Sequence, residues 1–157
     1  MHHSAPRLFR SNAAGIAPGG HYSHAVGAGP FVFVSGQLPI PPNGKPATRL
    51  SVAEQTRITL ENVERALAAA GASRTDVVKV TAYLTKEEHW DAFNRAYARF
   101  FGEHRPARAA VPVGRLHYGV AIEIEAIAYV GTTARKPAAS RGRSARRARG
   151  SGPRSTR

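Results

Sequence analysis

The chain has 157 residues, a length that predicts one domain with a single core rather than several domains. Hydrophobic residues make up 42% and charged residues 21% of the sequence, and no run reaches the roughly 18 apolar residues of a membrane span, so we expect a soluble globular protein. The absence of cysteine excludes disulfides, thiolate nucleophiles and cysteine-ligated metals, and it is compatible with a reducing, cytoplasmic setting.

The net charge of +13 is concentrated at the C-terminal end. Nine basic residues and no acidic residue fall in 135–157, which leaves +4 (13 − 9) for residues 1–134. Because alanine supplies almost all the apolar surface of 132–157, we expect a disordered Arg-rich tail. Nonspecific contact with nucleic acid would follow from this charge. No aromatic residues are interleaved with the arginines, so we favour solubilising or nonspecific behaviour over a dedicated RNA-binding role.

The N-terminal part of the chain contains one predicted hairpin between two irregular segments. Residues 1–20 are expected to form a flexible extension, and they make too poor an amphipathic helix to favour an organelle presequence. Phe31–Val34 is an aromatic and β-branched run that predicts a strand, and Tyr22–Val26 is expected to pair with it. Pro39–Pro46 is predicted to be a loop because of its prolines and glycine.

A first helix is predicted from the capping box formed by Ser51 and Glu54 to Gly71, which stands where a helix commonly ends. Val77–Leu84 follows as a β-rich run on which this helix can pack. The helix has one apolar face, because suitable residues recur at steps of three and four: Thr56, Leu60, Val63, Leu67 and Ala70.

A second helix is predicted from about Glu88 to Phe101, with Gly102 as its end and a row of aromatic residues that we assign to the core rather than to a cofactor site. Arg108–Val113 and Ala121–Val130 are predicted strands. The order of elements indicates an α+β fold in which two helices cover one face of a mixed sheet.

Searches for common catalytic and binding motifs give nothing, because the sequence has no phosphate-binding loop, dinucleotide fingerprint, zinc-protease motif or nucleophile elbow. His21 and His24 are the only histidines with a spacing that suggests paired ligands, and no carboxylate pattern supports them, so no metal site is expected. Arg108 and Glu123 remain as candidates, although each alone would ordinarily be a solvated or ion-paired surface residue.

A resemblance to a known family changes that view. The segments PARAAVPVGRL (106–116) and IEIEAIA (122–128) resemble the most specific motifs of the Rid family of reactive-intermediate deaminases, also called the YjgF family. VSGQLP (34–39) resembles a further family segment. The resemblance extends over most of the ordered chain, and we place the Rid-like domain at residues 21–131.

The resemblance implies a chorismate-mutase-like fold assembled as a homotrimer, in which the sheets form a central barrel and the active sites lie in clefts between subunits. It implies hydrolytic deamination of reactive enamines and imines, the 2-aminoacrylate/2-iminopropanoate class, to 2-oxo acids and ammonia. The enzyme would thus be similar to a 2-iminobutanoate/2-iminopropanoate deaminase, with a small imino acid as substrate and no metal or organic cofactor.

The same resemblance implies roles for individual residues. Arg108 is expected to bind the substrate carboxylate, because a guanidinium offers a planar, two-point hydrogen bond. Glu123 is expected to direct water and move the proton, and it is favoured over Glu125 on the same face of its strand. The other residues expected to line the substrate pocket are Tyr22, Ser35, Gly36 and Asn94.

The chain departs from the family pattern at His21, Arg105, Ala110 and His117. None of these changes removes the arginine, so we expect them to affect substrate identity more than reaction type. Two alternatives stay open: a non-catalytic Rid-fold protein that binds small molecules, and an RNA-associated protein acting through the basic tail.

Overall fold

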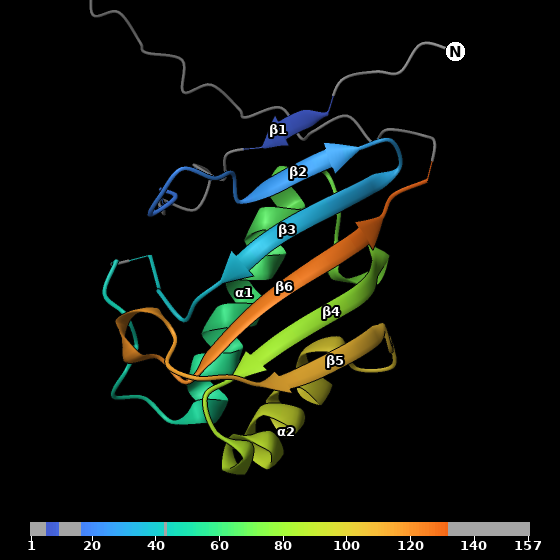
Figure 1. Cartoon of the computed structure of the whole chain (residues 1–157). Helices are drawn as coiled ribbons and strands as arrows, with labels where there is room; N and C mark the ends of the chain where they lie inside the picture. The colour runs from blue at the N-terminus through green and yellow to red at the C-terminus, as the bar shows by residue number, and fades with distance from the viewer. Residues whose placement is uncertain (1–5, 10–16, 43, 132–157) are drawn as a thin grey trace, which may run out of the picture.

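The fold is a single twisted sheet with both helices on one face (Figure 1). The computed structural model describes residues 6–9, 17–42 and 44–131. Helices α1 (Val52–Ala69) and α2 (Trp90–Phe101) lie behind the sheet in Figure 1. The sheet has the order β1-β2-β3-β6-β4-β5, with β4 and β5 parallel and every other pair antiparallel. Its strands are β1 (Arg7–Phe9), β2 (Ala25–Ala28), β3 (Phe31–Gln37), β4 (Val77–Leu84), β5 (Ala107–Pro112) and β6 (Ile122–Tyr129). The predicted α+β class is confirmed.

One part of the N-terminal expectation is wrong. The flexible extension expected at 1–20 contains strand β1, which pairs with β2 in the register Leu8↔Val26. Without β1, the outer edge of β2 would leave its peptide groups unpaired, and pairing satisfies them. The tail expected at 132–157 lies outside the described residues.

Helix α1 is confirmed at both ends. The Ser51 hydroxyl accepts a hydrogen bond from the Glu54 amide, and the Glu54 carboxylate accepts one from the Ser51 amide. Gly71 follows the helix with φ +78°, a left-handed conformation that glycine adopts without steric cost.

The core lies between the helices and the sheet. Residues of β6 alternate as predicted, so that Ile122 and Ile124 are fully buried whereas Glu123 and Glu125 face the side without helices. Other fully buried side chains of the core are Leu60, Val63, Leu67, Val80 and Phe93. Neither α1 nor α2, the two α-helices of the described ranges, combines the length and the hydrophobicity that a bilayer-spanning helix needs.

The β3–β6 ladder is interrupted where the candidate residues lie. Val34 pairs with Ala126 and Gln37 with Ile124, so β3 accommodates one residue more than β6 between these two pairs. A bulge of this kind bends a strand and redirects its side chains. It places the predicted residues Ser35 and Gly36 at the irregular point of β3.

Helix α2 differs from the prediction at its start and in the role of its aromatic residues. It begins at Trp90, after a short 3-10 turn at Glu87–His89. Phe93 and Tyr97 are buried as expected, whereas Trp90 is 42% exposed. The aromatic row therefore belongs only partly to the core, and its exposed end faces β5.

Candidate active site

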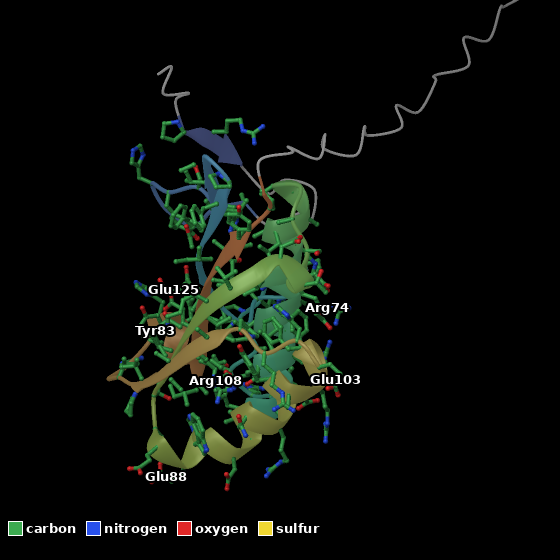
Figure 2. All side chains as sticks on the ribbon, turned by 90° about the vertical axis from the view of Figure 1, so that its right-hand side faces the viewer. Arg74, Tyr83, Glu88, Glu103, Arg108 and Glu125 are labelled. Carbon is green, nitrogen blue, oxygen red and sulfur yellow. The ribbon has the colours of Figure 1, made fainter. Side chains whose placement is uncertain are left out.

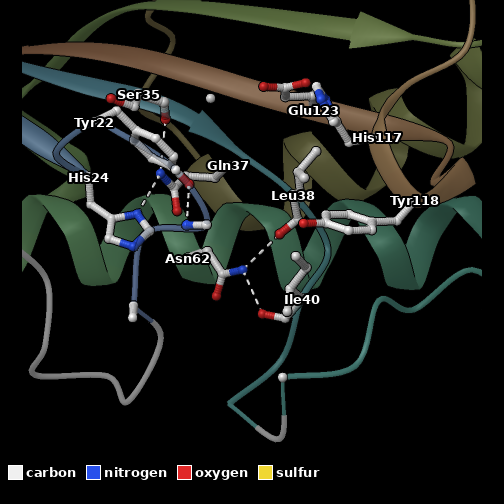
Figure 3. A pocket seen from close by; sticks show the side chains of 15 residues that line it. Tyr22, His24, Ser35, Gln37, Leu38, Ile40, Asn62, His117, Tyr118 and Glu123 are labelled. Atoms are coloured by element: carbon white, nitrogen blue, oxygen red, sulfur yellow. Dashed lines mark hydrogen bonds between the residues drawn. The ribbon is translucent and has the colours of Figure 1, made fainter.

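A pocket of about 620 Å³ opens beside β3 and β6 and holds four of the six predicted site residues (Figure 3). Three of them, Ser35, Gly36 and Glu123, form a polar corner, and Tyr22 lies on the segment that leads into β2. The loop between β5 and β6 completes the pocket with a short turn, η4 (His117–Gly119). The whole lining is Ala17, Gly19, Gly20, Tyr22, His24, Ser35, Gly36, Gln37, Leu38, Ile40, Gly44, Asn62, His117, Tyr118 and Glu123.

Glu123 occupies space that only a glycine at position 36 leaves free. A Cβ added to Gly36 would lie 1.9 Å from Glu123 Oε1 and 2.9 Å from its carboxyl carbon. The bulge in β3 and the missing side chain thus let the carboxylate lie directly against the strand. The requirement for glycine at position 36 is steric, because its backbone is not in the left-handed region.

Burial raises the pKa of Glu123 above its ordinary value, because desolvation disfavours the carboxylate. The electrostatic interaction with His117 opposes this rise in the pKa of Glu123, and that with Glu125 adds to it. Glu125 itself accepts a hydrogen bond from the Tyr83 hydroxyl at 3.1 Å and lines a separate hollow of about 310 Å³ on the open face. Glu123 is therefore the carboxylate that faces the pocket.

Three residues that sequence reasoning did not select support the pocket. Ser35 Oγ donates to the Ser23 carbonyl at 2.6 Å. The Gln37 amide donates to the Ser35 carbonyl at 3.0 Å and to His24 Nδ1 at 3.3 Å (Figure 3). His24 is buried, and its Nε2 has no hydrogen-bond partner. Asn62 donates to two carbonyls of the loop after β3. Asn62 could have been found from the sequence, because it is a polar residue beside the apolar face of a predicted helix.

The other two predicted site residues, Arg108 of β5 and Asn94 of α2, are joined by a hydrogen bond. Figure 2 shows Arg108 between β5 and α2. Arg108 Nη1 donates to Asn94 Oδ1 at 3.1 Å. The guanidinium carbon also lies 4.5 Å from the ring centre of Tyr97, 5.2 Å from that of Phe93 and 5.0 Å from that of Trp90. The guanidinium is thus held by aromatic faces and one amide oxygen.

The positive charge of Arg108 has no carboxylate partner among the described residues. The rings beside it stay neutral, since burial raises the pKa of Tyr97 to about 12 although the charge of Arg108 opposes the shift. A half-buried arginine with one weak neutral acceptor retains most of its hydrogen-bond donors for an anion.

Arg108 and Glu123 lie on opposite faces of the sheet within one chain. Arg108 pairs with the buried Val80 of β4, so its side chain lies on the helix side. Glu123 of β6 pairs with Tyr83 of β4. Tyr83 is one of the β4 residues whose side chains point to the face without helices. Arg108 does not line the pocket that holds Glu123. Within one chain the predicted site residues therefore lie in two separate groups, called half-sites below: Tyr22, Ser35, Gly36 and Glu123 in one, Arg108 and Asn94 in the other.

Within the described ranges, no group of three or more His, Asp or Glu side chains is placed to hold a metal ion. The polar groups of both half-sites are suited to hydrogen bonding and proton transfer.

Comparison with known proteins shows extensive similarity. The family model described as endoribonuclease L-PSP matches residues 12–130. A RutC family protein from Pyrococcus horikoshii, PH0854, is 48% identical over 122 residues, which are 78% of this chain and 95% of the relative. An Escherichia coli protein named "Putative reactive intermediate deaminase TdcF" is 43% identical over 119 residues, covering 71% of this chain and 90% of the relative. The crystal structure of E. coli TdcF with bound serine has a TM-score of 0.70 and 38% identity, and the match covers 78% of this chain and 98% of that one.

Proposed function

Because this chain belongs to the Rid (YjgF) family of reactive-intermediate deaminases, whose endoribonuclease L-PSP model spans residues 12–130, we propose that it hydrolyses small 2-imino acids and their enamine tautomers to 2-oxo acids and ammonia. The observation that carries the proposal is the close approach of Glu123 to Gly36, which places a partly desolvated carboxylate in a pocket. Because burial raises its pKa, this carboxylate is better suited than an ordinary one to accept a proton and return it during turnover.

In the proposed reaction, Glu123 accepts a proton from water as the oxygen attacks the imine carbon. The resulting carbinolamine carries the amino nitrogen and the new hydroxyl on one carbon. The imine nitrogen is protonated before attack, so the carbinolamine is neutral. Glu123 then returns the proton to the nitrogen, the C–N bond breaks with departure of ammonia, and Glu123 accepts the hydroxyl proton as the C=O bond of the 2-oxo acid forms; the released ammonia takes this proton as ammonium. Water is the only co-reactant that this sequence of steps consumes. An enamine enters the same route once protonation of its terminal carbon converts it to the imine.

Arg108 is proposed to bind the substrate carboxylate. Its guanidinium has no carboxylate partner among the described residues, and Asn94 and the aromatic faces hold it in place. Two parallel hydrogen bonds from a guanidinium fix a carboxylate in one orientation, which determines where the neighbouring imine carbon lies.

We further propose that a homotrimer unites the two half-sites, with Arg108 from one subunit and Glu123 from its neighbour. Support comes from the placement of these residues on opposite faces of one sheet. The helix-free face also exposes large apolar side chains that a second copy would cover: Phe31, Phe33, Val111 and Tyr129.

Mixing two inactive variants tests this arrangement. Arg108→Ala and Glu123→Gln subunits are unfolded together in equal amounts, refolded, and assayed against a 2-aminoacrylate or 2-iminopropanoate substrate generated in situ. In randomly mixed trimers about one quarter of the clefts would receive both intact residues, so activity should return to about that fraction of wild type. Each variant refolded alone serves as the control. Absence of recovery in mixtures that refold to trimers would contradict a shared site, and an inactive wild-type protein would contradict the deaminase itself.

Two alternative functions can be tested with the same protein. If the chain is a non-catalytic small-molecule-binding protein, it should bind a 2-oxo acid through Arg108 without turning over any imine. The nine basic residues of 135–157 favour a second property, weak and salt-dependent association with nucleic acid. A chain ending at residue 131 should then retain less RNA than the full chain at low salt, and equal retention would exclude the tail.

A further inference from the structure

Tyr118 has a backbone conformation that its side chain makes unfavourable. Its φ is 59° and its ψ is 5°, and it is the only residue other than glycine with a positive φ in the part of the chain that the structure describes. Bulky residues rarely occupy this left-handed region, in which asparagine or glycine is common. The next residue, Gly119, has φ +74°, so the turn between β5 and β6 contains two successive left-handed residues.

Within one chain, the described residues give Tyr118 little packing. Its side chain is 60% exposed, and His117 is the only described residue whose ring lies beside it, with ring centres 6.2 Å apart. A strained and exposed aromatic residue contributes little to stability. Its position in the pocket lining therefore points to a role in ligand binding.

Tyr118 spans the pocket away from its polar corner. A Cβ placed on Gly19 would lie 3.7 Å from the Tyr118 hydroxyl, so the ring reaches from the β5–β6 turn to the segment before β2. Leu38 and Ile40 line the same part of the pocket, as Figure 3 shows. Tyr118, Leu38 and Ile40 thus give the pocket an apolar part in addition to the polar groups of Ser35 and Glu123.

The backbone beneath this apolar part is already satisfied. Asn62 Nδ2 donates to the Leu38 carbonyl at 2.8 Å and to the Ile40 carbonyl at 3.0 Å, and Arg65 donates to the Asn62 oxygen. These bonds fix the loop after β3 and leave its leucine and isoleucine side chains, rather than its carbonyls, as the groups offered to a ligand. The subsite is therefore held in a defined form before a ligand binds.

We propose that Tyr118, with Leu38 and Ile40, forms a side-chain subsite that selects imino acids with a branched or aromatic apolar side chain. The proposal rests on the deaminase function and names its substrate class. The side chain of a leucine- or phenylalanine-derived imine would extend from the reacting carbon beside Glu123 toward the Tyr118 ring and the side chains of Leu38 and Ile40.

The test compares imines generated in situ from L-alanine, L-leucine and L-phenylalanine by an amino-acid oxidase. The imine that remains is trapped with semicarbazide, so that a decrease in the trapped product measures imine hydrolysis. Tyr118→Asn removes the ring with a residue that tolerates a positive φ, and Tyr118→Phe is the matched control that keeps the ring. We expect wild type to favour the two larger imines. In Tyr118→Asn, kcat/KM should fall about tenfold for them and less than about twofold for the alanine-derived imine, the scale on which a pocket distinguishes one or two methylene groups. Tyr118→Phe should keep the wild-type ratio.

A binding measurement separates this proposal from the deaminase function. Calorimetry with 4-methyl-2-oxopentanoate and pyruvate should show tighter binding of the larger acid by wild type and a loss of that preference in Tyr118→Asn. An equal fall for all substrates, a wild-type preference for the alanine-derived imine, or a preference unchanged in Tyr118→Asn would overturn the subsite and leave the deaminase intact. A Tyr118-dependent binding preference without turnover of any imine would overturn the deaminase and retain the subsite.

Discussion

Replacement of Arg108 by alanine is the most direct test of the proposed chemistry. The guanidinium has no carboxylate partner among the described residues, so the substrate carboxylate would be its main charged partner. Removing one partner of a hydrogen-bonded charge pair in a desolvated site costs about 2–5 kcal/mol. This corresponds to a loss of about 30-fold to several thousand-fold in kcat/KM.

The same substitution has a separate and smaller effect on folding. Arg108 would lose its contacts with the rings of Trp90, Phe93 and Tyr97 and its hydrogen bond to Asn94. Cation–π contacts contribute about 0.5–2 kcal/mol, so we expect Tm to fall by a few degrees, with the folded state retained at the assay temperature. Thermal unfolding monitored by circular dichroism separates this loss from the loss of activity.

Two further variants test whether activity requires the guanidinium of Arg108 specifically. Arg108→Lys keeps the charge and loses the planar fork, so it should recover only part of the activity. Arg99→Ala removes an exposed arginine of α2 that is not part of either half-site and should keep wild-type turnover. The reasoning would be refuted if the folded Arg108→Ala protein turned over imines at the wild-type rate, or if Arg99→Ala lost as much activity as Arg108→Ala.

Three other outcomes follow from the geometry. Gly36→Ala places a Cβ 1.9 Å from Glu123 Oε1, so the carboxylate must move; we expect at least a tenfold loss of kcat with a stability change below about 1 kcal/mol, and a crystal structure with Glu123 unmoved would contradict this. Because burial raises the pKa of Glu123, the folded state binds a proton more readily than the unfolded state, and stability falls as pH rises from the ordinary carboxyl pKa through the raised one. Glu123→Gln should therefore be inactive yet have a higher Tm than wild type at pH 7. This difference in Tm should disappear at low pH. In the wild-type pH–rate profile, the acid limb should lie above the ordinary carboxyl pKa. Asn94→Ala removes the acceptor of Arg108 Nη1 and should raise KM by about tenfold, measured by initial rates, whereas an unchanged KM would show that the aromatic faces alone position the guanidinium.

Much of the local structure follows from adjacent residues. The capping box at Ser51 and Glu54 defines the start of α1, because its two hydrogen bonds form within one turn. The alternation along β6 separates Ile122 and Ile124 from Glu123, since successive side chains of a strand point to opposite faces. These features depend on neighbours a few residues away, and they were predictable for that reason.

Strand β1 and the bulge in β3 were not predictable in the same way. Arg7–Phe9 has no alternation that distinguishes it from an irregular segment, and it becomes a strand because the edge of β2 offers unpaired peptide groups. The need for glycine at position 36 depends on Glu123, which is 87 positions later in the chain and reaches it only through the β3–β6 pairing.

The α+β class and both helices could be predicted from the residue pattern, and the family resemblance pointed to the candidate residues of the two half-sites. The placement of Arg108 and Glu123 on opposite faces of the sheet, and the contacts of the α2 aromatic residues with Arg108, became known only from the folded chain. The fold also revealed Tyr118 as a strained pocket residue. The physical reason is that helix and strand formation depend on hydrogen bonds and burial within a short stretch of chain, whereas a binding site depends on contacts that exist only after distant strands have paired.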